Sequence, residues 1–223
     1  MTSRCGGYSP LMTSTAEHQT EITTIDGLPI RWDQRLLRPR PWTAAHGKWA
    51  AELAAEAPAG PILELCSGAG HIGLVAARRS GRALVQVDRE PAAAAYARVN
   101  ADAWGVATET RTASVDEALA ADERFPIVVV DPPWLTTDQL AAYPEDPRGA
   151  VDGGADGMAA LRTCMRVALD HVCVGGAVVL QAGHPGQVTT VVDEIVGPGH
   201  RLVEMRDLRP GGVLAHFTRD AGR

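Results

Sequence analysis

Short apolar segments that alternate with helical segments are the feature of this sequence that most restricts its fold. Apolar runs typical of buried strands occur at 62–65, 83–87, 127–130 and 177–181, with a weaker one at 108–113. Helical patterns occur at 43–57, 71–79, 91–104, 115–121, 156–173 and 188–196. Strands separated by helices pair in parallel, which predicts an α/β fold with a doubly wound sheet. Residues 202–207 and 213–218 flank a Pro-Gly-Gly turn and predict an antiparallel pair. We therefore expect a mostly parallel seven-stranded sheet with an antiparallel last strand.

The chain is long enough for one α/β domain with a full core, at 223 residues. Residues 1–21 are polar and weakly patterned, which predicts a disordered arm. We expect residues 22–42 to form a short N-terminal extension with a hairpin at Gly27, and residues 43–223 to form the main domain. Thr43 is the expected N-cap of the first long helix.

The composition excludes several classes of protein. No apolar run approaches the length of a membrane span, and the N-terminus lacks the apolar core of a signal peptide. The four cysteines are scattered without CxxC spacing, so we expect neither a disulfide framework nor a metal site, and a cytoplasmic location. A net charge of −6 does not indicate a large nucleic-acid footprint. The sequence leaves the oligomeric state open.

A turn rich in small residues follows the first predicted strand of the sheet, at Cys66-Ser67-Gly68-Ala69-Gly70. Small residues let the backbone approach a ligand closely. The Gly-Lys-Ser/Thr ending of a P-loop is missing, and Cys66 replaces the first Gly of a GxGxxG turn. Glu64 inside the strand disfavours a pyrophosphate and suits a cationic ligand end, while Asp88 at the end of the next strand is placed for a ribose diol. S-adenosylmethionine carries an ammonium, a sulfonium and a ribose, so it fits this pattern better than a dinucleotide.

The segment Asp131-Pro132-Pro133-Trp134 follows the apolar run 127–130, at the strand end where ligands of open α/β sheets bind. The Asp131 carboxylate and the Pro132 carbonyl can accept both N–H bonds of an amide or exocyclic amine, which localises its lone pair for attack on a methyl group. The prolines fix the loop, and Trp134 can stack on a planar group. The later loop Asp138–Arg148 is long for a connection and predicts a lid or substrate loop.

Together these motifs resemble class I S-adenosylmethionine-dependent methyltransferases, which implies a Rossmann-like methyltransferase fold. Residues 64–70 resemble that family's E/D-x-G-x-G-x-G signature, and Asp88 matches its ribose-binding acid. The resemblance places Glu64 near the methionine amino group, and Ser114 and Val115 beside the adenine. It implies that the cofactor-binding residues are Glu64, Cys66, Ser67, Gly68, Gly70, Asp88, Arg89, Ser114, Val115 and Asp131.

The catalytic segment is similar to the D/N-P-P-Y/F/W motif of amino-methyltransferases, which implies catalytic roles for Asp131, Pro132, Pro133 and Trp134. Residues 37–43 resemble the L-I-P-R-P-E-T segment of release-factor glutamine methyltransferases (the HemK-like branch), and residues 150–158 resemble their A-L-x-G-G-x-D-G-L segment. This likeness implies substrate contacts from Arg40, Trp42 and Trp134. The chain departs from that branch at Asp131, Trp134 and Trp42, where the branch usually has Asn, Tyr and Glu.

The sequence therefore predicts an S-adenosylmethionine-dependent N-methyltransferase with an amide or exocyclic amine as acceptor, in a glutamine-like protein side chain or a small molecule. The first alternative is an adenine or guanine amino-methyltransferase on RNA or DNA, because Asp131 and Trp134 also occur in such enzymes. The net charge makes this alternative less favoured. The second alternative is a cofactor-binding module without catalysis, and the third is a dinucleotide reductase.

Overall fold

The structure is a computed structural model and describes residues 18–220. The expected disordered arm, residues 1–21, lies almost entirely outside the described residues. Its last described residues lead into strand β1 (Glu21–Ile25). No helix within residues 18–220 combines the length and the apolar character that crossing a membrane requires.

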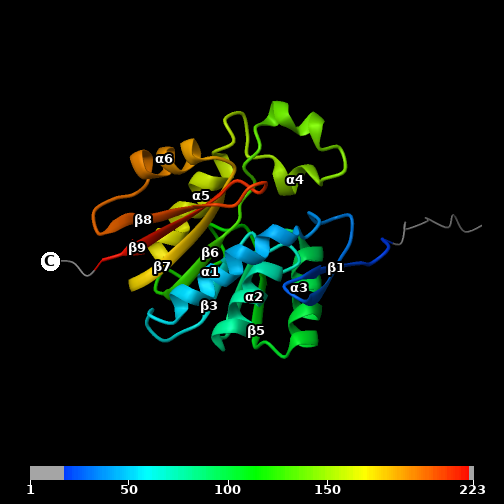
Figure 1. Cartoon of the computed structure of the whole chain (residues 1–223), viewed down its shortest axis with the longest axis horizontal. Helices are drawn as coiled ribbons and strands as arrows, with labels where there is room; N and C mark the ends of the chain where they lie inside the picture. Colours follow the sequence, from blue (N-terminus) through cyan, green and yellow to red (C-terminus); the bar gives the residue numbers. More distant parts are fainter. Residues whose placement is uncertain (1–17, 221–223) are drawn as a thin grey trace, which may run out of the picture.

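A seven-stranded sheet forms the centre of the molecule, in the order β5-β4-β3-β6-β7-β9-β8 (Figure 1). Neighbouring strands from β5 to β7 pair in parallel, and β9 runs antiparallel to both β7 and β8. The predicted fold class is therefore confirmed, including the antiparallel last strand. The strands are β3 (Ile62–Leu65), β4 (Leu84–Asp88), β5 (Thr108–Thr112), β6 (Phe125–Val130), β7 (Val172–Ala182), β8 (His200–Asp207) and β9 (Val213–Arg219).

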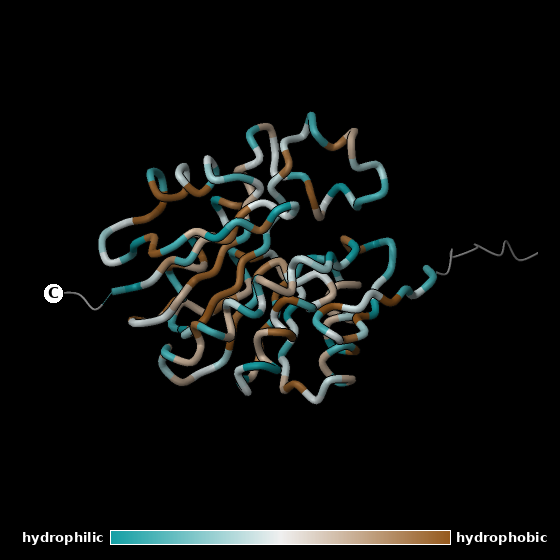
Figure 2. The backbone as a smooth tube through the Cα atoms, in the orientation of Figure 1, coloured by the Kyte–Doolittle hydropathy of each residue, from teal (hydrophilic) through white to brown (hydrophobic). Residues whose placement is uncertain are grey.

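Helices cover both faces of the sheet, because successive strand residues point to opposite sides. In β6, Ile127 and Val129 pack in the cluster beneath α1 (Ala44–Ala54), α2 (His71–Ser80) and α3 (Pro91–Trp104). Val128 and Val130 pack on the other face, against α5 (Ala159–His171) and also toward α6 (Pro185–Glu194). Figure 2 shows the central strands as a largely hydrophobic band, with hydrophilic and hydrophobic residues mixed along the surrounding helices and loops.

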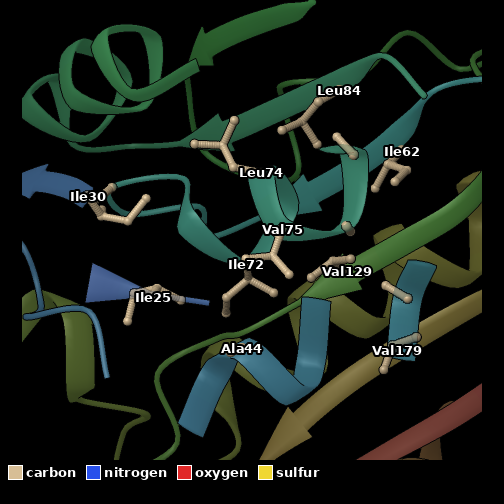
Figure 3. Packing of buried hydrophobic residues seen from close by; sticks show 14 of the residues in the cluster. Ile25, Ile30, Ala44, Ile62, Ile72, Leu74, Val75, Leu84, Val129 and Val179 are labelled. Atoms are coloured by element: carbon tan, nitrogen blue, oxygen red, sulfur yellow. The ribbon is translucent and has the colours of Figure 1, made fainter. Parts of the chain in front are cut away.

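The predicted N-terminal hairpin is present as β1 paired antiparallel with β2 (Leu28–Trp32). Ile25 and Ile30 are buried in the same hydrophobic cluster as Ile72 and Val75 of α2 (Figure 3). The Asn100 side chain of α3 also accepts a hydrogen bond from the Arg31 backbone N–H (2.9 Å) and donates one to its carbonyl (2.9 Å). The hairpin thus packs on the main core, while the domain boundary at residue 42/43 stays a prediction.

One local expectation is wrong and another holds only for its position. Residues 115–121 form turns instead of a helix, because Arg111 donates to the Ala118 carbonyl (3.1 Å) and the Glu123 carboxylate accepts from the Ala120 N–H (2.7 Å). Thr43 stands at the N-cap position of α1, but it has a helical conformation and its side chain makes no capping hydrogen bond. Its hydroxyl donates to the Arg40 carbonyl (2.6 Å) instead.

The long loop after β6 contains the 3-10 helix Thr137–Ala142 and the short helix α4 (Arg148–Val151). We call residues 135–153 the lid loop. It projects from the body of the fold above the carboxyl ends of the central strands (Figure 1). The strand β7 begins earlier than expected, because the Gly175-Gly176 pair lies inside it and not in a preceding turn.

Candidate functional site

A cavity of about 930 Å³ opens at the carboxyl ends of β3, β4 and β6. Its floor includes the small-residue turn after β3, Asp88 at the end of β4, and Asp131 directly after β6. Residues from the stretch 35–43, which we call the N-terminal wall, close one side. Residues 147–150 and Asp152 of the lid loop close another. Parallel α/β sheets bind ligands at this edge, so the cavity lies where the sequence predicts a site.

Asp88 holds the small-residue turn against β4. Its carboxylate accepts hydrogen bonds from the Gly68 N–H (2.8 Å) and the Glu90 N–H (2.9 Å). Burial raises the pKa of Asp88, and the two backbone bonds oppose that shift. Each carboxylate oxygen has a further lone pair, so Asp88 can still accept from the hydroxyls of a ribose at the cavity wall. Gly68, with φ at 50°, adopts the left-handed conformation that brings its N–H to Asp88.

Glu64 lies behind the cavity wall and does not line it. Its side chain is 1% exposed and accepts hydrogen bonds from the Gly73 N–H (2.9 Å) and the Gln86 side-chain amide (2.5 Å). Burial raises the pKa of Glu64 to about 8, so the group is largely protonated at neutral pH. Glu64 joins α2 to the sheet through these two hydrogen bonds. Its expected contact with a cationic ligand end stays a prediction.

Asp131 presents a carboxylate to the cavity that no described residue hydrogen-bonds. Burial alone raises the pKa of Asp131 to about 7. The Pro132 carbonyl likewise lacks a hydrogen-bond partner among residues 18–220. Two adjacent acceptors with free lone pairs can take the two N–H bonds of a planar amide or amine.

Trp134 packs away from the cavity lining. Its ring lies against the backbone of Gly183 at the end of β7, so close that a side chain at position 183 would collide with it. Its backbone carbonyl accepts from the Gln187 side chain (3.0 Å). Trp134 is not among the residues that line the cavity, and its expected stacking on an acceptor stays a prediction.

The N-terminal wall and the lid loop are joined across the cavity mouth. One guanidinium nitrogen of Arg40 contacts both carboxylate oxygens of Asp146 in the lid loop (2.8 and 2.9 Å), and the guanidinium lies 6.0 Å from the Trp42 ring centre. Arg89 donates to the Gly149 carbonyl of the same loop (2.7 Å). Both arginines thus hold the lid loop. The guanidinium N–H groups that form these bonds were expected to contact ligands.

The structure gathers most of the predicted site residues around one cavity. Those that line it are Arg40, Cys66, Ser67, Gly68, Asp88, Arg89, Ser114, Val115, Asp131 and Pro133. Five others lie outside the lining, namely Glu64, Gly70, Pro132, Trp42 and Trp134. Trp42 packs against Gly211 in the turn before β9, where a side chain would collide with its ring.

Sequence reasoning missed cavity residues that come from two helices. His71 at the start of α2 lines the cavity and is hydrogen-bonded through Nε2 to the Thr43 hydroxyl (2.9 Å). Thr163 and Cys164 enter from α5, and the Cys164 sulfur lies 3.5 Å from that of Cys66. The helical period of α5 predicts a buried face for Cys164 but not which cavity that face borders. Within the described residues no group of three or more His, Cys, Asp or Glu side chains could hold a metal ion.

The chain is similar to known methyltransferases. Residues 50–143 match the family model of the methyltransferase small domain. The release factor glutamine methyltransferase of Cereibacter sphaeroides is 33% identical over 174 residues, which cover 73% of this chain and 61% of that protein. The ribosomal protein uL3 glutamine methyltransferase of Bradyrhizobium diazoefficiens is 27% identical over 172 residues, which cover 70% of this chain and 54% of that protein. The chain thus spans between about half and three fifths of the length of these curated relatives.

Solved structures bear out the same fold. The crystal structure of the SAM-dependent methyltransferase from Agrobacterium tumefaciens superposes with a TM-score of 0.64 at 15% identity, over 93% of this chain and 72% of that chain. The chain therefore has the fold of Rossmann-like methyltransferases, its residues 50–143 match the methyltransferase small domain, and it is similar in sequence to release factor glutamine methyltransferases.

Proposed function

We propose that this chain is an S-adenosylmethionine-dependent N-methyltransferase that acts on an amide or exocyclic amine nitrogen. The observation that carries the proposal is the unpaired Asp131 carboxylate, which faces a cavity that also contains Asp88 and the Gly68 turn. The family of the chain and the names of its relatives support the same reaction type.

The cavity residues fit the proposed cofactor. Asp88 keeps free lone pairs for a ribose diol, and the small residues at 67–69 leave room for a ligand to lie against the backbone. Ser114 and Val115, at the end of β5, lie where the adenine is expected, next to Asp88 in the lining. Arg89 donates a hydrogen bond to the lid loop, so we expect it to form part of the cavity wall and not to bind the cofactor through its charge. When bound, the cofactor supplies an electrophilic methyl group on a sulfonium.

Asp131 and the Pro132 carbonyl position the acceptor nitrogen. Each accepts one N–H bond, which turns the nitrogen lone pair out of conjugation and toward the methyl carbon. The bound cofactor would supply the methyl group, its sulfur would keep the electron pair of the broken sulfur–carbon bond, and the acceptor nitrogen would become positive. Asp131, with its pKa raised to about 7, offsets that charge and can accept the proton that the nitrogen then releases.

For the acceptor we propose a glutamine-like side chain of a protein or a small-molecule amide. The relatives named for release factor and uL3 glutamine methylation support a protein acceptor. The net charge of −6 supports it over RNA or DNA. Such acceptors, and the scattered cysteines, favour action in the cytoplasm.

The direct test uses Asp131→Ala with tritiated S-adenosylmethionine and a cell extract that contains the acceptor. We expect the wild type to label protein and the variant to lose at least about 100-fold in rate, because one of two nitrogen-positioning acceptors is gone. Its affinity for S-adenosylhomocysteine should change less than threefold. Undiminished labelling by the variant would contradict the proposal. Label in RNA would support the alternative of a nucleic-acid acceptor.

A further inference from the structure

Gln187, in the first turn of α6, hydrogen-bonds three separate segments beside the motif Asp131–Trp134. Its Oε1 accepts from the Gly183 N–H (2.8 Å), and its Nε2 donates to the carbonyls of Trp134 (3.0 Å) and Gly157 (3.0 Å). The side chain is 4% exposed. Both N–H bonds and the oxygen of the Gln187 amide therefore have hydrogen-bond partners, and the bond to Trp134 is one of these three.

The packing around this amide leaves no room for larger neighbours. A Cβ at position 157 would lie 2.7 Å from the Trp134 carbonyl oxygen and 3.0 Å from Gln187 Nε2. A Cβ at position 183 would lie 3.1 Å from Gln187 Oε1 and would collide with the Trp134 ring. Glycines at 157 and 183 are therefore required for the Trp134 backbone to reach the Gln187 amide.

The motif has few other anchors of its own. Pro132 and Pro133 have no backbone N–H, so two successive residues cannot donate to the surrounding chain. The Asp131 N–H lies 3.5 Å from the Leu65 carbonyl, a long contact. The Pro132 carbonyl must stay free if it is to accept from a substrate. Two hydrogen bonds thus hold the carboxyl-terminal end of the motif. The Gln187 side chain donates to the Trp134 carbonyl, and the adjoining Leu135 N–H donates to the Val151 carbonyl (3.1 Å).

We infer that Gln187 is a positioning residue of the transfer site, which fixes the Trp134 backbone and so sets where the Asp131 carboxylate and the Pro132 carbonyl meet the acceptor nitrogen. This inference rests on the proposed function for its effect on transfer. The anchoring itself does not, because it follows from the hydrogen bonds alone.

Two variants test the donor and the acceptor groups of the Gln187 amide separately. Gln187→Glu keeps an acceptor for the Gly183 N–H, but an ionised carboxylate cannot donate to the carbonyls of Trp134 and Gly157. Gln187→Ala removes all three bonds. If the hold on Trp134 is what matters, the two variants behave alike, whereas if the Gly183 bond matters, Gln187→Glu keeps wild-type behaviour. Thr189→Ala on the exposed side of the same helix is the matched control.

The experiment measures amide hydrogen exchange in peptides covering residues 131–137, S-adenosylhomocysteine affinity, and the rate of methyl transfer to extract protein. We expect Gln187→Ala and Gln187→Glu to raise exchange in this segment at least about tenfold and to slow transfer about 10- to 100-fold. Affinity for S-adenosylhomocysteine should stay within threefold, and Thr189→Ala should match the wild type in all three. Exchange that stays at the wild-type level in a folded Gln187→Glu variant would overturn the inference, as would equal losses of cofactor affinity and transfer. Failure of the proposed function looks different, because the wild type itself would then neither bind S-adenosylhomocysteine nor transfer methyl while the exchange result would still stand.

Discussion

At the scale of single residues, two carboxyl groups decide how the site works, the buried Glu64 and the half-buried Asp131. Asp131 and Glu64 both have pKa values raised by burial, to about 7 and about 8, but only Asp131 faces the cavity. Glu64 is satisfied by the Gly73 N–H and the Gln86 amide, whereas Asp131 has no described partner. A buried carboxylate without a partner costs folding free energy, which is typical of groups retained for chemistry.

Asp131→Asn should stabilise the protein at neutral pH and not in acid. The folded pKa of Asp131, about 7, lies above its unfolded value, so the folded state holds the proton over a wider pH range. The stability that this proton contributes is complete below about pH 4 and is lost as pH rises through about 7. The free energy of unfolding of Asp131→Asn should therefore exceed that of the wild type by about 1–3 kcal/mol at pH 8, with no difference near pH 4. Urea titrations at several pH values, with the exposed Asp193→Asn as control, measure this, and a pH-independent difference would contradict it.

Glu64→Gln should leave cofactor affinity nearly unchanged. The amide oxygen can still accept from the Gly73 N–H, and the geometry gives Glu64 no contact in the cavity. Glu64→Ala should instead lower the free energy of unfolding by about 2–4 kcal/mol, because it leaves the Gly73 N–H without its partner and the Gln86 amide with only the Gly70 carbonyl as acceptor. Calorimetric titration of each variant with S-adenosylhomocysteine checks the first point. A loss of tenfold or more in Glu64→Gln would mean that the Glu64 charge acts on the ligand.

At the scale of the elements, the cavity is closed by two segments that the Arg40–Asp146 salt bridge joins. The Asp146 side chain is 7% exposed and that of Arg40 is 28% exposed, so the pair is largely shielded from solvent. The lid loop is thereby tied to the N-terminal wall at Asp146 and to Arg89 at Gly149. The acceptor must enter between these two segments.

Arg40→Ala and Asp146→Ala should loosen the lid loop to the same extent. We expect each to raise the rate of limited proteolysis within residues 135–153, and a double-mutant cycle to give a coupling of about 0.5–2 kcal/mol. If Arg40 only holds the lid loop, both variants slow methyl transfer equally. A much larger loss for Arg40→Ala would show that Arg40 also contacts the acceptor, as its place in the sequence predicts.

Elements whose ends are set by local chemistry could be predicted closely. The strand 62–65 and the helix 91–104 match the structure, since Pro91 opens α3 and Gly105 ends it in the left-handed conformation. Elements decided by distant side chains could not. Residues 115–121 have a helical pattern, but Arg111 and Glu123 hold them in turns. Likewise the sequence indicates Asp131 and Asp88 as site residues, whereas the inward placement of Glu64 depends on Gln86 of the neighbouring strand.

At the scale of the whole molecule, a seven-stranded sheet with helices on both faces leaves one edge open to ligands, and both predicted motifs meet there. Under the proposed function the cofactor would lie over β3 and β4 and the acceptor over β6, so both would share this cavity. We expect the N-terminal wall and the lid loop to contact the acceptor, because residues of both segments line the cavity.

The most direct test of this account is an isothermal titration of the purified chain with S-adenosylhomocysteine. We predict one site per chain with a Kd of about 1–100 μM, a value typical of a preformed small-molecule cavity. Asp88→Ala should weaken binding at least about tenfold, because Asp88 holds the Gly68 turn and is placed for the ribose. Absence of binding by the folded wild type at ligand concentrations near about 1 mM would contradict the account.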